Sequence, residues 1–146
     1  MRSERIKIIL DTNIWISFAI GKRLNEVERV LKNPCIEVFV CEKLLREVNA
    51  TLSKPKLRKY VSVERKNVLL NYMAACSLVS IYEQTILSRD VDDNYLLDLA
   101  RGTDADYLIT GDNDLLVLQR YSQTKILNFS DFLLIFDTIQ NHNFPN

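Results

Sequence analysis

Histidine and glycine are scarce in this sequence, and their scarcity excludes several kinds of active site. The one histidine, His142, lies close to the end of the chain. A histidine general base, a Ser/His or Cys/His nucleophilic pair and a histidine-containing zinc site are therefore not expected. The three glycines, Gly21, Gly102 and Gly111, cannot form a phosphate-binding glycine-rich loop or a Gly-x-Ser-x-Gly nucleophile elbow.

Cysteine pairs, long apolar runs and an excess of one charge are also missing. The three cysteines, Cys35, Cys41 and Cys76, are odd in number and lack Cys-x-x-Cys spacing, which predicts small buried thiols in a reducing compartment. No apolar run reaches the roughly 18 residues of a membrane-spanning helix, and the charged N-terminus does not resemble a signal peptide. We therefore expect a cytoplasmic protein without a membrane segment.

The charge balance limits the ways in which this chain can bind a polyanion. Lys plus Arg and Asp plus Glu each total 19, so the formal net charge is zero. A non-specific coat on nucleic acid requires a strong basic excess and is not expected, although a local basic groove remains compatible with the composition. The 146 residues match the commonest domain size and predict a single domain over 1–146, with a frayed tail over 142–146.

Apolar runs alternate with helical patterns along the whole chain. Strands are predicted at 6–10, 35–40, 78–82, 107–110 and 125–127. Helices are predicted at 13–20, 25–32, 42–52, 63–76, 93–101 and from Ser130 onward, with Ser62 and Ser130 as N-caps and a further helical pattern from Leu115 to near Tyr121. The fold class is therefore α/β: a three-layer α/β/α sandwich with a central, mainly parallel sheet of about five strands.

Acidic residues follow two of the predicted strands at the point where each strand ends. Asp11 follows the strand at 6–10, and Asp112 and Asp114 follow the strand at 107–110. Each acid alone also fits a turn or a helix cap. Because parallel strands end at one edge of their sheet, where ligands bind in such folds, we expect these exits to meet. Carboxylates without histidine or cysteine favour a hard cation, Mg²⁺ or Mn²⁺.

A third acidic group, Asp90, Asp92 and Asp93, precedes the helix that leads into the fourth strand. Asp93 shares a helix face with Leu96, Leu97 and Ala100 and is therefore predicted to point toward the core side. Buried carboxylates that lie close together raise each other's pKa unless a cation neutralises them. A metal site is the simplest explanation for such a cluster.

Four segments together resemble the acidic motifs of the PIN-domain nucleases. They are Asp11-Thr12-Asn13-Ile14, Leu44-Leu45-Arg46-Glu47-Val48, Arg89-Asp90-Val91-Asp92-Asp93-Asn94 and Ala105-Asp106-Tyr107-Leu108-Ile109-Thr110-Gly111-Asp112. The likeness extends to residues 113–116 and 126–129 and is greatest to the short prokaryotic proteins described as toxins of toxin–antitoxin pairs. The resemblance implies a metal-dependent endoribonuclease, a cognate antitoxin partner and a homodimer.

Residue by residue, the resemblance implies specific roles for the acids. Asp11, Glu47, Asp93 and Asp112 would be the catalytic, metal-binding acids, with Asp114 as a supplementary metal ligand or a group that orients water. Asp90 or Asp92 could take the place of Asp93. Thr110, Asn13 and Arg89 would line the pocket or contact substrate. The assignment of Glu47 rests on the resemblance. Glu47 lies off the helical stripe of Leu45, Val48 and Leu52, so the helical pattern alone predicts a solvated charge.

RNA is the substrate class that the resemblance favours, although nothing in the residues distinguishes RNA from DNA. The basic residues Lys54, Lys56, Arg58 and Lys59, together with Lys22 and Arg23, fit phosphate contacts as well as ordinary solvated charge. Salt-dependent affinity would indicate phosphate contacts. Trp15 and Phe18 are assigned to the core in preference to base stacking.

Two further classes compete with a nuclease. The first is a catalytically inactive PIN-like module that binds RNA or protein. The second is a phosphoacceptor signalling domain, which requires an Asp after its third strand and a Lys after its fifth. The third predicted strand here runs into Tyr82-Glu83-Gln84, and Lys125 begins the fifth predicted strand instead of following it, so this second class is disfavoured.

Overall fold

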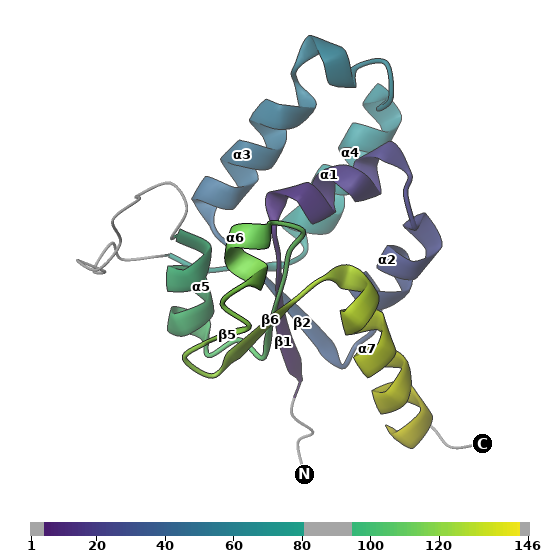
Figure 1. Ribbon diagram of the computed structural model, residues 1–146. Coiled ribbons are helices and arrows are strands. Elements are labelled where there is room, and N and C mark those ends of the chain that lie inside the picture. The colour runs from purple at the N-terminus through teal and green to yellow at the C-terminus, as the bar shows by residue number, and fades with distance from the viewer. Residues whose placement is uncertain (1–4, 81–94, 144–146) are drawn as a thin grey trace.

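A six-stranded sheet runs through the centre of the protein in the order β3-β2-β1-β4-β6-β5. The computed structural model describes residues 5–80 and 95–143 (Figure 1). The strands are β1 Ile6–Leu10, β2 Ile36–Val40, β3 Ser77–Leu78, β4 Tyr107–Ile109, β5 Arg120–Tyr121 and β6 Thr124–Leu127. All neighbouring pairs are parallel except β5 and β6, which are antiparallel. The predicted α/β sandwich with a mainly parallel sheet is confirmed.

The central strands are apolar because both of their faces are covered. Ile8 and Ile9 of β1 and Leu108 of β4 are fully buried, as expected for parallel strands between helical layers. Trp15 and Phe18 also lie in the core. The assignment of both aromatic residues to core packing is therefore confirmed.

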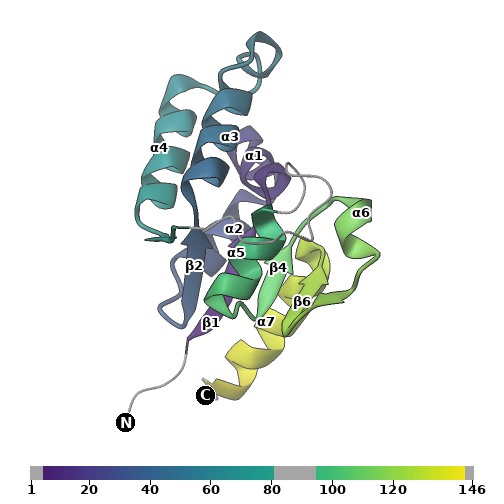
Figure 2. The same cartoon turned by 90° about the vertical axis from the view of Figure 1, so that its left-hand side faces the viewer.

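Helices cover both faces of the sheet and extend beyond one of its edges. They are α1 Thr12–Ile20, α2 Leu24–Leu31, α3 Glu42–Leu52, α4 Val63–Ala74, α5 Tyr95–Thr103, α6 Asn113–Leu116 and α7 Phe129–Asn143, with a short 3-10 helix, η1, at Pro55–Leu57. Figures 1 and 2 show α5 on one face of the sheet and α2 with α7 on the other. Helices α3 and α4 rise side by side beyond the carboxyl ends of the strands (Figure 2).

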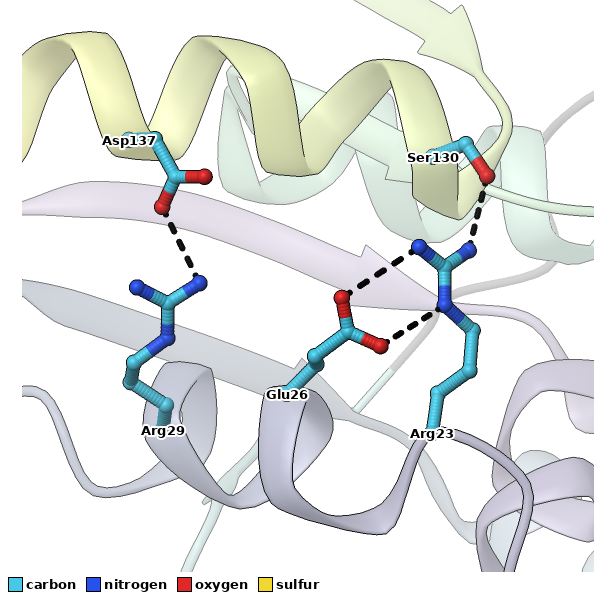
Figure 3. A network of polar contacts seen from close by, with 5 residues as sticks. All are labelled: Arg23, Glu26, Arg29, Ser130 and Asp137. Carbon is cyan, nitrogen blue, oxygen red and sulfur yellow. Dashed lines mark hydrogen bonds and ion pairs between the residues drawn. The ribbon is translucent and has the colours of Figure 1, made fainter.

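Charged side chains hold α7 against α2 (Figure 3). Arg29 forms an ion pair with Asp137 at 3.0 Å, and its guanidinium lies over the Phe136 ring. At the other end of the contact, Arg23 donates to Ser130 Oγ at 2.7 Å. Beneath these contacts, Phe132 and Phe136 of α7 are almost completely buried.

The last part of the chain departs from prediction in three ways. The helical pattern predicted from Leu115 to near Tyr121 is wrong, because α6 ends at Leu116 and the chain turns into the β5–β6 hairpin. The predicted N-cap Ser130 is also wrong: α7 begins one residue earlier, and Asn128 Oδ1 accepts from the amide of Asp131. Finally, α7 continues through Asn143, past the predicted start of the frayed tail at 142.

Other predictions need smaller corrections. The third strand is Ser77–Leu78, shorter than the predicted 78–82, of which residues 81–82 lie outside the described part. The three cysteines are free thiols, but of these Cys41 alone is buried, and Cys35 and Cys76 are half-buried. Across residues 5–80 and 95–143, no helix has the length and apolarity needed to cross a membrane.

Candidate active site

The exits of β1 and β4 lie next to each other at the carboxyl edge of the sheet. The two strands pair in parallel, with Leu10 opposite Ile109, and the amide of Asp11 donates to Ile109 O at 2.9 Å. The residue that follows each strand therefore emerges beside its neighbour. This register places Asp11 and Thr110 together at the start of the candidate site.

Asp11 is a buried carboxylate held at both oxygens. Its side chain accepts from the Thr12 amide at Oδ1 and from the Thr110 hydroxyl at Oδ2, each at 2.6 Å. Asp11 is 8% exposed and Thr110 is fully buried. Because both donors belong to the ends of regular elements, the carboxylate has a fixed orientation.

Thr110 also links Asp11 to the second acid. The amide of Asp112 donates to Thr110 Oγ1 at 3.0 Å, so a single hydroxyl contacts both acidic segments. Asp112 is half-buried and caps α6 by accepting from the Asp114 amide at 3.0 Å. Asp114 is exposed. Asp112 thus serves as a helix cap and stands beside Asp11 at the same time.

Glu47 reaches this edge from α3. Its Oε1 accepts from Thr12 Oγ1 at 3.2 Å and from the Tyr95 hydroxyl at 2.5 Å. The side chain is half-buried, so the interpretation of Glu47 as a solvated helix charge is wrong. The error arose from the choice of stripe: Leu44, Val48 and Leu52 face the core, and Glu47 lies one turn after Leu44 on that side.

Electrostatics indicate that the three acids share one environment. Burial raises the pKa of Asp11, and the negative charges of Asp112 and Glu47 raise it further, against the opposing effect of the hydrogen bonds from Thr110 and Thr12. Burial and the Glu47 carboxylate likewise raise the pKa of Tyr95 far above its usual range. The phenol therefore stays protonated and acts as a donor to Glu47.

Several predicted site residues are not part of this cluster or cannot be placed. Asn13 is exposed, and no hydrogen bond within the described residues joins its side chain to the acids. Asp93, its alternatives Asp90 and Asp92, and Arg89 lie outside the described residues. Within 5–80 and 95–143, no group of three or more Asp, Glu, His or Cys side chains has an arrangement that could hold a metal ion.

The donor set determines which chemistry this edge can support. Asp11, Asp112 and Glu47 supply only carboxylate oxygens, which suit hard cations. Burial raises the pKa of the nearby Cys41 thiol, so this thiol is not an activated nucleophile. Acid–base or metal-assisted chemistry on an anionic substrate fits these residues best.

Thr12 and Tyr95 were not recognised as site residues from the sequence. Tyr95 is 8% exposed and is the first described residue of α5. Its position directly after the Asp90–Asn94 acidic segment was the available indication, because a tyrosine beside acids and at the start of an apolar helix has a ring to bury and a hydroxyl that needs a partner. Thr12 was visible only as the second residue of the first acidic motif.

Comparison with known proteins adds two similarities. The family model described as PIN domain matches residues 7–114. This range contains Asp11, Glu47, Thr110 and Asp112. The chain is also 33% identical over 130 residues to the uncharacterized protein MJ1680 of Methanocaldococcus jannaschii, a match that covers 82% of this chain and 79% of the relative.

Proposed function

Because the chain belongs to the PIN domain family, we propose that it hydrolyses RNA phosphodiester bonds as a Mg²⁺- or Mn²⁺-dependent endoribonuclease. PIN domains are generally nucleases, so a hydrolase that acts on nucleic acid follows from family membership. The observation that carries the finer proposal is the meeting of Asp11, Asp112 and Glu47, which come from three separate elements, through hydrogen bonds with Thr110 and Thr12.

The proposed metal fits the chemistry of these donors. The pKa of Asp11 is raised by burial and, to a smaller extent, by two neighbouring carboxylates, and a divalent cation would stabilise its charged form. Asp11 and Asp112 would hold the ion with Asp93 as a further ligand, Glu47 would complete the acidic edge, and Asp114 would be a supplementary ligand. The bound ion would stabilise negative charge on the phosphate and lower the pKa of water.

The chain's own residues supply positioning. Thr110 holds the Asp11 carboxylate through Oδ2 and accepts from the Asp112 amide, so the Asp11 side chain and the Asp112 backbone keep a fixed relation to each other. Thr12 and Tyr95 hold Glu47 through Oε1. In the proposal, Asn13 and Arg89 orient the RNA backbone at this edge.

Cleavage of a mixed RNA pool in Mn²⁺, Mg²⁺ or chelator tests the proposal. We expect Asp11→Asn to reduce the rate by about 1,000-fold or more, because metal assistance contributes several kcal/mol and each 1.4 kcal/mol is a factor of ten. Asp104→Asn is the matched control: it makes the same charge change at an exposed residue before β4, at the opposite edge of the sheet. Equal activity in both variants would contradict the proposal.

A binding module without catalytic activity is the second candidate. It would use the same fold and the same acidic edge, so activity distinguishes it from the nuclease. Wild-type protein that binds RNA but leaves RNA and single-stranded DNA of the same sequence intact in Mn²⁺ would select this candidate.

The biological role we propose is that of a toxin in a type II toxin–antitoxin pair, acting as a cytoplasmic homodimer with a cognate antitoxin. The resemblance of the four acidic motifs to the short prokaryotic subgroup supports this role. Growth arrest on expression, relieved by the product of a neighbouring small reading frame and absent for Asp11→Asn, is the expected result. Normal growth during expression of soluble, active protein would contradict it.

A further inference from the structure

The turn between α3 and α4 carries an uncompensated cluster of positive charge. Lys54, Lys56, Arg58 and Lys59 are exposed, and the sequence has no acid between Glu47 and Glu64. Among the ion pairs of residues 5–80 and 95–143, none involves these four cations. In a chain of zero net charge, this segment, residues 54–60, is a local basic surface; we call it the basic tip.

The basic tip is an ordered turn. Successive backbone hydrogen bonds run from Leu57 to Lys54, from Arg58 to Pro55 and from Tyr60 to Leu57, at 3.0–3.2 Å. From α4, Lys66 Nζ donates to Ser53 Oγ at 3.1 Å and closes the base of the turn. Because the backbone of the tip is already ordered, binding of a ligand to these cations costs little further backbone entropy.

The basic tip lies on the side of the sheet that carries the acids. Helix α3 begins at the carboxyl end of β2, contributes Glu47 to the candidate site and ends just before the tip (Figures 1 and 2). At about 1.5 Å of rise per residue, the stretch from Glu47 to Lys54 extends about 10 Å along the helix axis. A strand only a few nucleotides long can therefore reach from the acids to the tip.

An aromatic side chain accompanies the cations. Tyr60 is 62% exposed, which is unusual for a large ring and leaves a face open for stacking on a nucleobase. Cations that follow a phosphate backbone, combined with an exposed aromatic ring, are the two components of sequence-tolerant binding to single strands. A surface that bound a polyanion through its cations alone would not depend on the ring.

We propose that the basic tip is a second contact for single-stranded RNA, which holds the flank of the substrate while the acids act on the scissile bond. The inference rests on the proposed endoribonuclease function. It adds a requirement for substrate length, since an RNA too short to reach from Glu47 to Lys54 gains nothing from the tip.

Binding in chelator, where no cleavage takes place, isolates this contact. The tip variant carries Lys54→Gln, Lys56→Gln, Arg58→Gln and Lys59→Gln. The control variant carries Arg5→Gln, Lys32→Gln, Arg101→Gln and Lys125→Gln, which removes the same charge from exposed positions elsewhere. Fluorescence anisotropy compares a labelled RNA of about 2 nucleotides, too short to span the roughly 10 Å from Glu47 to Lys54, with one of about 16 nucleotides, the upper end of the site sizes of single-strand binders.

We expect the affinity of the tip variant for the long RNA to fall by at least about tenfold and its affinity for the short RNA to stay the same, with the control unchanged. The slope of log affinity against log salt should fall by about 0.7 for each phosphate that the variant no longer neutralises. Tyr60→Ala should weaken binding of the long RNA with no change in that slope. These three results together would establish the tip as an RNA contact.

Two outcomes would overturn the inference. One is a tip variant that binds the long RNA with wild-type affinity and salt slope. The other is a tip variant that loses as much affinity for poly-glutamate of matched charge as for the long RNA, while Tyr60→Ala has no effect. That result would identify a general anion-binding surface suited to an acidic protein. Wild-type protein that binds RNA through the tip but cleaves none in Mn²⁺ would instead contradict the nuclease proposal alone.

Discussion

The hydroxyl of Tyr95 donates to Glu47 Oε1 at 2.5 Å, across 48 residues of sequence. This contact ties the start of α5 to the middle of α3 and fixes one oxygen of the carboxylate. Thr12 binds the same oxygen from α1. Three helices thus hold one glutamate in place, which gives this side chain a defined orientation at the acidic edge.

Tyr95→Phe should lower the free energy of unfolding through the loss of this hydrogen bond. Bonds to charged groups contribute about 1.5–3 kcal/mol, and the lower end applies because Glu47 is only half-buried. Tyr107→Phe is the control, since the Tyr107 hydroxyl has no hydrogen bond among the described residues. Urea unfolding compares the two, and equal effects would show that the contact contributes nothing specific.

An activity assay of Tyr95→Phe should show whether Tyr95 positions Glu47 or binds RNA. With Glu47 less constrained, we expect Tyr95→Phe to need more Mn²⁺ for half-maximal cleavage while its affinity for RNA in chelator stays at the wild-type level. Glu47→Gln should show the same pattern in a stronger form. A weakened affinity for RNA with normal metal dependence would assign Tyr95 to the substrate instead.

Asp11 should destabilise the fold near neutral pH when no metal is present. Its folded pKa is raised above 3.8, first by burial and then by Asp112 and Glu47. Between 3.8 and the raised value the folded state binds more protons than the unfolded state, so stability falls as pH rises through that window. The penalty is about 1.4 kcal/mol for each unit of the pKa increase.

Asp11→Asn removes this penalty and should therefore be the more stable protein at about pH 7, with the difference closing as pH falls through the raised pKa toward 3.8. Urea unfolding in chelator at several pH values measures this difference. Asp104→Asn, at an exposed position, should show no such trend. A loss of stability in Asp11→Asn at neutral pH would mean that its hydrogen bonds outweigh the burial of its charge.

A side chain at Gly21 should destabilise the fold. Its φ is +97°, and an added Cβ would lie 2.6 Å from Arg65 Nη1, which donates to the neighbouring Ile20 carbonyl. The left-handed backbone alone costs a non-glycine residue about 1–2 kcal/mol, so Gly21→Ala should lower the melting temperature. Gly102→Ala is the control: it has open space and a helical position, and should stabilise by about 0.5–1 kcal/mol.

The start of α7 offers a test of which residue caps it. Asn128→Ala removes the side chain that accepts from the Asp131 amide and should cost about 1 kcal/mol. Ser130→Ala removes an exposed bond to Arg23 and should cost less. Urea unfolding measures both, and a larger loss for Ser130→Ala would restore the serine as the cap.

Much of the fold could be predicted because buried parallel strands have continuous apolar runs in their sequence. The bounds of β1 and α3 match the prediction, and Ser62 caps α4 by accepting from the Arg65 amide. The pattern failed where tertiary contacts decide. Residues 115–121 have helical spacing, yet β5 adds to the edge of the sheet, and the chain reverses there with Gln119 and Ser122 at positive φ.

The site was only partly predictable for the same reason. Asp11, Thr110 and Asp112 follow strands, and the register of parallel strands brings such residues together. Glu47 and Tyr95 come from helices whose rotation about their axes depends on packing, and a stripe chosen one residue away reversed the interpretation of Glu47. A contact between side chains of two helices cannot be predicted from the sequence of either helix alone.

The packing of α7 against α2 limits how far the protein can be shortened. The match to the PIN domain ends at residue 114, yet β6 completes the pairing of β4, and α7 buries Phe132 and Phe136 after that point. A polypeptide cut at residue 114 would leave β4 without a partner on one side and expose the apolar surface under α7. The smallest autonomous folding unit is therefore longer than the recognised motif, and its last helix is as necessary to it as the first strand.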